Sequence, residues 1–182
     1  MPRTRVILFA LAAFAALALP AVLVTSQNDA GKAIGTPASA EEPQRLTIPS
    51  IDVNSPLLRL APDKAPPPEN GMTAGWYTAS ARPGEPGAAV IIGHKAPDGR
   101  AVFRDLHRVG KGEAIEVERG DGKVLRFTVT ATRTLDKPAD FPAAEVFHAP
   151  GERALRLVTC TGERDARGHP VHDLVVYATL RS

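Results

Sequence analysis

Short apolar or alternating segments recur along residues 43–182, and prolines or glycines lie between them. The chain contains 17 prolines and 15 glycines, which interrupt helices and favour turns. No long stretch of this region has the apolar spacing of an amphipathic helix. Eight segments have the length and pattern of strands: 45–48, 51–53, 57–60, 88–92, 114–118, 124–132, 154–158 and 174–178. The pattern predicts an all-β domain, either a barrel or a sandwich.

Three connecting segments have recognisable local signals. Residues 119–123 read Arg-Gly-Asp-Gly-Lys and lie between two alternating segments, so they predict the turn of a β-hairpin. Residues 102–106 and 141–147 predict short helical turns.

The N-terminal segment, residues 1–24, predicts a membrane anchor or an export signal. Arg3 and Arg5 precede 19 uncharged residues, 6–24, which as a helix would extend roughly 28 Å, close to the thickness of the hydrocarbon core. A signal peptide has a shorter apolar core, of about 7–15 residues, followed by small residues such as those at 20–22 or 38–40. We expect a retained single-pass anchor in the cell membrane with the rest of the chain outside, because arginines stay on the cytoplasmic side.

Residues 25–42 are polar and contain Ser, Asn, Asp, Gly, Thr and Pro with little apolar content, which predicts a flexible linker. The remaining residues, 43–182, have the length of one domain. The formal net charge is only +2 and basic side chains alternate with acidic ones, which argues against a nucleic-acid partner. We expect a monomer.

Cys160 is the only cysteine of the chain and follows the apolar segment 154–159. Outside the cell, structural cysteines form disulfides in pairs, so a single cysteine in an exported domain predicts a reactive thiol or an intermolecular bridge. The alternative is a buried cysteine that acts as a small apolar residue. The reactive interpretation makes the chain a candidate cysteine enzyme.

His94 follows the apolar segment 88–92 as Cys160 follows 154–159. If these two strands are adjacent and parallel, an imidazole and a thiol lie at the same edge of the sheet. A thiol has a reference pKa of about 8.5, so it needs a neighbouring imidazolium or other cation to hold its thiolate. No pair of histidines has a convincing metal-ligand spacing, because Pro170 lies between His169 and His172. We therefore expect no metal and no cofactor.

The chain resembles a class F, actinobacterial-type sortase, a membrane-anchored cysteine transpeptidase. The resemblance extends over nearly the whole domain, and its motifs occur in the family's order. They are Leu-Thr-Ile-Pro at 46–49 with Ile-Asp-Val at 51–53, Gly-His at 93–94, Leu-Val-Thr-Cys-Thr-Gly at 157–162 and Leu-Val-Val-Tyr-Ala at 174–178. The resemblance implies an eight-stranded sortase-type β-barrel with short helical turns, preceded by the transmembrane helix, and a catalytic histidine, cysteine and arginine.

Within that resemblance, His94 and Cys160 match the catalytic histidine and cysteine. The final strand has no arginine at its start, and the two arginines in the preceding loop are Arg164 and Arg167. We favour Arg167 because it is nearer the last strand and precedes a Gly-His turn, and we keep Arg164 as the alternative. Thr159 is a candidate substrate-binding residue through its hydroxyl, or simply a β-branched strand residue.

The resemblance also implies a reaction. Cys160 would cleave an LPXTG-like sorting signal between Thr and Gly through a thioacyl intermediate. A peptidoglycan-linked amine would then accept the exported protein, with His94 and Arg167 assisting. The alternative is a catalytically impaired, membrane-anchored β-barrel that binds partners without turnover, which is favoured if the arginine is missing.

Overall fold

The computed structural model describes residues 39–62, 71–96, 100–136, 143–164, 166, 168 and 170–181. The predicted membrane segment, 1–24, and most of the predicted linker lie outside these ranges, so both stay predictions. Within the described ranges, the structure contains no helix with the length and apolar character needed to cross a bilayer. Glu42, which we assigned to the linker, is buried and accepts hydrogen bonds from Arg59 at 2.7 and 2.8 Å. The packed domain therefore includes Glu42.

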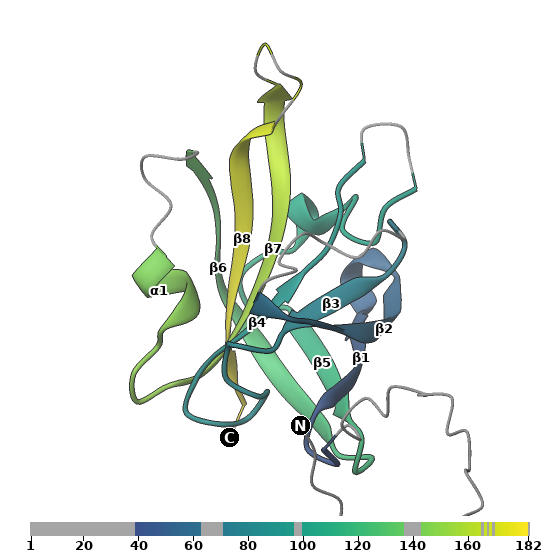
Figure 1. Ribbon diagram of the computed structural model, residues 1–182, viewed down its shortest axis with the longest axis vertical. Helices are drawn as coiled ribbons and strands as arrows, with labels where there is room; N and C mark the ends of the chain where they lie inside the picture. The colour runs from purple at the N-terminus through teal and green to yellow at the C-terminus, as the bar shows by residue number, and fades with distance from the viewer. Residues whose placement is uncertain are drawn as a thin grey trace, which may run out of the picture. The chain divides into compact units, whose positions relative to one another are not determined.

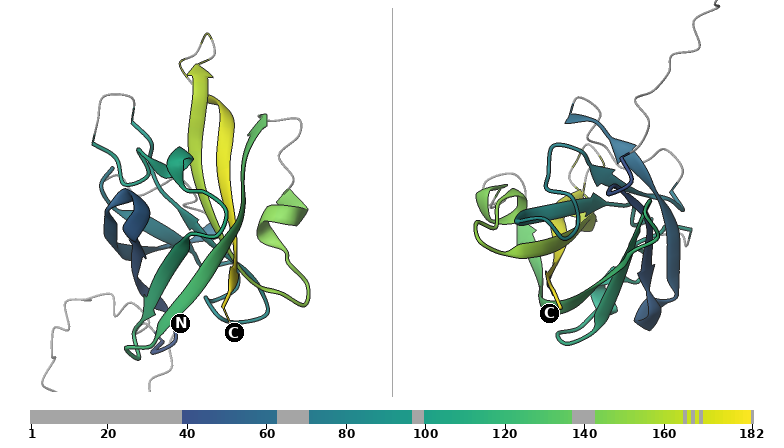
Figure 2. Two further views of the ribbon diagram at one scale, coloured as in Figure 1. Left: turned by 180° about the vertical axis from the view of Figure 1, so that it is seen from behind. Right: turned by 90° about the horizontal axis from the view of Figure 1, so that it is seen from below.

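The described residues form an all-β closed barrel of eight strands with little helix, as predicted (Figures 1 and 2). Around the barrel the order is β1-β2-β3-β4-β7-β8-β6-β5. The strands are β1 (Pro43–Ile48), β2 (Val53–Leu60), β3 (Ala74–Tyr77), β4 (Gly87–Ile92), β5 (Ala114–Arg119), β6 (Val124–Asp136), β7 (Arg153–Arg164) and β8 (Pro170–Leu180). The helical elements are η1 (Pro49–Ile51), η3 (Leu106–Arg108) and α1 (Ala143–Phe147).

The prediction of a separate strand at 51–53 is wrong. Residues 49–51 form η1, a single 3-10 turn, and Asp52 adopts a left-handed backbone with φ of 54°. Proline at position 49 favours this turn because its ring fixes φ near the helical value and it supplies no N–H. The chain reverses here, so Val53 begins β2 in antiparallel pairing with Ile48.

The sequence interpretation missed β3. Its four residues, Ala74–Tyr77, include a glycine and lack the alternation that marks a half-buried strand. Gly75 is needed here because a Cβ at this position would lie 2.5 Å from the side chain of Leu60 on the neighbouring strand. The strand forms because it lies between β2 and β4, with parallel pairing on one side and antiparallel pairing on the other.

The predicted hairpin and one of the two predicted helical turns are confirmed, while the other helical turn lies further along the chain than expected. The β5–β6 hairpin turns at 119–123, where Gly122 has φ of 76°. Arg119 bonds the carboxylate of Asp121 and holds the pKa of that carboxyl below its usual value. The predicted helical turn at 141–147 corresponds to α1, while the turn expected at 102–106 becomes irregular turns that lead into η3.

The interior of the barrel is one apolar core to which all eight strands contribute. Alternation of side chains along β7 divides its residues between two environments. Leu155 and Leu157 face the interior, whereas Val158 belongs to a second apolar cluster on the outer face, under α1. The loop that follows His94 also enters the barrel, because Phe103 is fully buried in the core.

Gly93→Ala tests how tightly this core holds the chain beside His94. A Cβ at Gly93 would lie 2.5 Å from Phe103 Cδ2 and 2.7 Å from Val102 Cγ1, both in the core. Overpacking of this kind costs roughly 1–3 kcal/mol, so we expect a lower Tm in thermal unfolding. Gly110→Ala is the matched control, because a Cβ there has no neighbour within 4 Å. Equal Tm values for the two variants would contradict the tight packing at Gly93.

Candidate active site

The predicted site lies where the parallel pairing of β4 with β7 ends. β4 ends at Ile92, but β7 continues to Arg164, so Cys160 lies within its strand and not after it as the sequence suggested. β4 and β7 pair in parallel from Gly87 opposite Arg153 to Ile92 opposite Val158. His94 follows Ile92 by two residues and Cys160 follows Val158 by two, so this register brings them to the same level. The expectation that these strands are adjacent and parallel is confirmed. Both residues are half-buried.

Hydrogen bonds hold the backbone on both sides of His94, although β4 has already ended at Ile92. The Gly93 N–H donates to the Val158 carbonyl at 3.1 Å, and the Phe103 N–H donates to the His94 carbonyl at 3.0 Å. Thr159 Oγ1 donates to the Gly93 carbonyl at 2.8 Å. These bonds connect the backbone of His94 to β7 on one side and to the core segment on the other.

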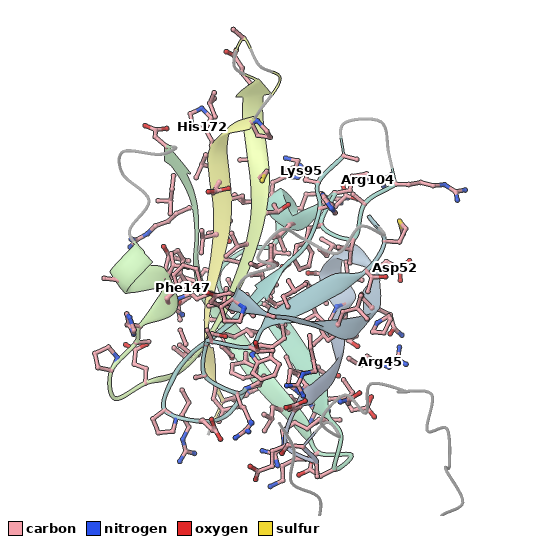
Figure 3. All side chains as sticks on the ribbon, viewed as in Figure 1. Arg45, Asp52, Lys95, Arg104, Phe147 and His172 are labelled. Atoms are coloured by element: carbon pink, nitrogen blue, oxygen red, sulfur yellow. The ribbon has the colours of Figure 1, made fainter. Side chains whose placement is uncertain are left out.

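Thr159 is 1% exposed, and its hydroxyl is engaged with Gly93. The described geometry therefore gives Thr159 a role in joining the two strands. Its assignment as a substrate-binding residue stays a prediction. Thr161, two residues after Thr159, accepts a hydrogen bond from Lys95 Nζ at 3.0 Å. Figure 3 shows Lys95 beside the upper part of β7.

The sequence interpretation missed the residues that β8 places beside the thiol. Asp173 lies directly opposite Cys160 in the antiparallel β7–β8 pairing and is buried. The next pair is Thr161 with His172, whose Nδ1 lies 2.7 Å from Asp136 Oδ1 on β6. The one available signal was polar residues inside the otherwise apolar segment that ends the chain.

Close contact between β7 and β8 continues past the thiol at Gly162. This residue has φ of 82°, and a Cβ on it would overlap the ring of His172. Both features require glycine, because a side chain here would be strained by its backbone and blocked by the ring. Figure 3 shows His172 at the upper end of the ribbon formed by β7 and β8.

The second apolar cluster adjoins the site on the outer face of the barrel. Val90, Val158 and Val175 are buried there against Val146 of α1. Five more side chains are partly buried at the margin of this cluster: Tyr77, Ile92, Ala131, Leu135 and Phe147. The rings of Tyr77 and Phe147 pack edge to face, with centroids 5.5 Å apart, and Figure 3 shows Phe147 beside the sheet. The centre of this cluster is covered by α1, and only the side chains at its margin remain partly exposed.

The arginine expected in the site stays a prediction. Arg164 is the last residue of β7, where it pairs with Pro170, and Arg167 lies outside the described residues. Trp76 packs in the core, and its indole N–H donates to the Ala81 carbonyl at 3.1 Å. In the described part of the chain, no three His, Cys, Asp or Glu side chains form a group that could bind a metal ion.

These features suit covalent catalysis by a thiolate. An imidazole level with a thiol can exchange a proton with it or with a leaving amine, and Cys160 is partly exposed. Asp173, which is buried opposite Cys160 on β8, adds a further polar group to the site.

Comparison with known proteins gives a consistent family. The structure of sortase C-1 from Actinomyces oris matches with a TM-score of 0.62 and 22% identity, over 76% of this chain and 72% of that one. Sortase A from Corynebacterium diphtheriae matches with a TM-score of 0.63 and 22% identity, over 80% and 63%. A sortase D5 transpeptidase from Clostridium perfringens matches with a TM-score of 0.58 and 19% identity, over 76% and 78%.

At these identities the structural matches show a shared fold. A search of curated proteins finds no match. The sortase domain family model matches residues 46–181, which include all the strands described above except the start of β1. The match covers most of the chain, and the protein belongs to the sortase family.

Proposed function

We propose that this sortase is a cysteine transpeptidase that cleaves LPXTG-like sorting signals between Thr and Gly. It then joins the exported protein to a peptidoglycan-linked amine. The observation that carries the proposal is the parallel pairing of β4 with β7, which brings His94 level with Cys160 in a chain that belongs to the sortase family. We assign it to class F on the motifs at 46–53, 93–94 and 157–162.

The first half of the reaction forms a thioacyl enzyme. The Cys160 thiolate attacks the carbonyl carbon of the substrate threonine, and a bond forms between Sγ and that carbon. The peptide C–N bond then breaks, and the imidazolium of His94 gives its proton to the leaving glycine amine. The electron pair of the broken bond leaves with the nitrogen.

The second half reverses these steps with a different amine. Neutral His94 removes a proton from the incoming amine, which attacks the thioester carbonyl carbon. A new amide bond forms, and the Sγ–C bond breaks to regenerate the thiolate. Arg167 supports the negatively charged intermediates in this scheme, because an arginine stays charged and donates several hydrogen bonds.

The partly buried apolar side chains at the margin of the outer cluster support a role in holding the sorting signal. Leucine and proline of such a signal are apolar, and the partly buried side chains of Ile92 and Phe147 lie at the margin of the outer cluster. An extended peptide that places its threonine at Cys160 can direct its leucine and proline along β4 and β7. Burial of apolar surface then favours binding.

The proposal includes the location of the enzyme. Residues 1–24 anchor it in the cell membrane as a single span, and residues 25–41 tether the catalytic domain on the outer side. The basic residues before the apolar segment support this orientation. In this location the sorting signals of exported proteins and the wall amine are both accessible.

Incubation of the full-length protein with an LPXTG peptide and an amine tests the reaction. Mass spectrometry should find the transpeptidation product and a thioacyl adduct on Cys160. We expect Cys160→Ala to abolish both, and His94→Ala to lower kcat/KM by roughly 10²- to 10⁴-fold, the contribution of general acid–base catalysis. Peptide binding without product or adduct, for several motif variants, would favour the non-catalytic binding module instead.

Comparison of Arg167→Ala with Arg164→Ala identifies the catalytic arginine. We expect Arg167→Ala to lower kcat by roughly 10²- to 10³-fold, as removal of a group that stabilises a developing oxyanion does. Arg164→Ala is the matched control, since it removes the same charge three residues earlier in the chain. A larger loss in Arg164→Ala would reverse the assignment, and small losses in both would exclude an arginine from this loop.

Thr159→Val tests whether this threonine joins strands or contacts substrate. Valine keeps the size of the side chain but leaves the buried Gly93 carbonyl without the hydroxyl donor. The loss should lower the free energy of unfolding by about 1–3 kcal/mol, measured by denaturant titration, while Thr159→Ser restores most of it. Unchanged stability together with a raised KM would instead assign the hydroxyl to substrate binding.

A further inference from the structure

Lys95 and Thr161 form a side-chain link beyond the last residue pair of β4 and β7. The paired strands end at Ile92 opposite Val158, yet His94 must stay at the height of Cys160 to exchange protons with it. One residue after His94, the ammonium of Lys95 donates to Thr161 Oγ1 at 3.0 Å, across 66 residues of sequence. The link continues the contact between the two strands past the histidine.

The link is one of two that bracket His94. Before the histidine, Thr159 Oγ1 donates to the Gly93 carbonyl at 2.8 Å. After it, Thr161 receives the Lys95 ammonium. The two threonines flank Cys160 on β7. Residues 93–95 are therefore attached to β7 both just before and just after Cys160.

Both links lie on the interior face of the sheet, opposite to the face that carries the Cys160 side chain. Thr159 is 1% exposed and points to the same side of β7 as Leu155 and Leu157, which fill the barrel. Thr161 shares that side and Cys160 takes the other, because successive residues of a strand face opposite ways and the pairing with β8 is regular from Thr159 to Thr161. A link on this side holds the histidine without occupying the space that a substrate needs.

We propose that Lys95 is a positioning residue, which acts through its bond to Thr161 to hold His94 level with Cys160. The inference rests on the proposed function, since it assigns Lys95 a part in the same reaction. A lysine suits this position because its long stem reaches across two strands and its ammonium donates a strong, charge-assisted hydrogen bond to a neutral hydroxyl. Lys95 itself does not touch the substrate.

Alkylation of Cys160 by iodoacetamide at pH 7 tests the proposal without requiring a sorting signal. The full-length protein is compared with Lys95→Met, Thr161→Val, His94→Ala and the two double variants that combine His94→Ala with each of the others. Lys111→Met is the matched control, since it removes an exposed lysine from the turn before β5. Circular dichroism and Tm establish that each variant is folded.

We expect Lys95→Met and Thr161→Val each to slow alkylation roughly two- to tenfold, the range for loss of one hydrogen bond. Neither should slow it further when His94 is already alanine, because a positioning residue acts only through the group that it positions. Lys95→Arg should restore most of the rate, and Lys111→Met should leave it unchanged. If Lys95→Met unfolds the protein, Thr161→Val alone decides the question.

Two results would overturn the proposal while leaving the proposed function intact. One is a wild-type rate in both Lys95→Met and Thr161→Val, with slow alkylation in His94→Ala. The other is an equal slowing by Lys95→Met with and without His94, which would mean that the ammonium acts directly on the thiol by its charge. Alkylation that is indifferent to His94→Ala would overturn both the positioning role and the proposed chemistry.

Discussion

The parallel pairing of β4 with β7 is the interaction on which the site depends. It brings together two segments that are 66 residues apart and sets their register at six paired positions. Parallel strands need a long crossover, and here the crossover contains β5, β6 and α1. A slip of one residue would move every side chain of one strand to the other face, and with it the thiol or the imidazole. The strands next to this pair help to keep the register in place.

The length of the neighbouring strands provides that support. β6, β7 and β8 have 13, 12 and 11 residues, while β3 has four. In Figure 1 they extend together beyond the rest of the barrel. Cys160 therefore lies within a paired strand, with Asp173 directly opposite, while His94 lies on a loop. Additional bonds are needed on the histidine side, where Thr159 and Phe103 supply them.

Local patterns predicted most of the fold. Alternating segments found seven of the eight strands, and the Gly-Asp-Gly turn found the β5–β6 hairpin. The errors have physical causes. Pro49 and Asp52 convert the expected strand at 51–53 into a turn, and β3 is stabilised by its two neighbours rather than by its own residues. Such strands leave little trace in a local pattern because their stability is a property of the sheet.

The sequence by itself determined the β-rich domain, its single cysteine and the two strands that lead to His94 and Cys160. Each of these is a property of adjacent residues. Only the tertiary structure decided that the two strands are parallel neighbours, that Asp173 lies beside the thiol, and that Thr159 and Lys95 connect the strands around the histidine. These contacts join residues far apart in the chain, and the closure of the barrel is what brings them together.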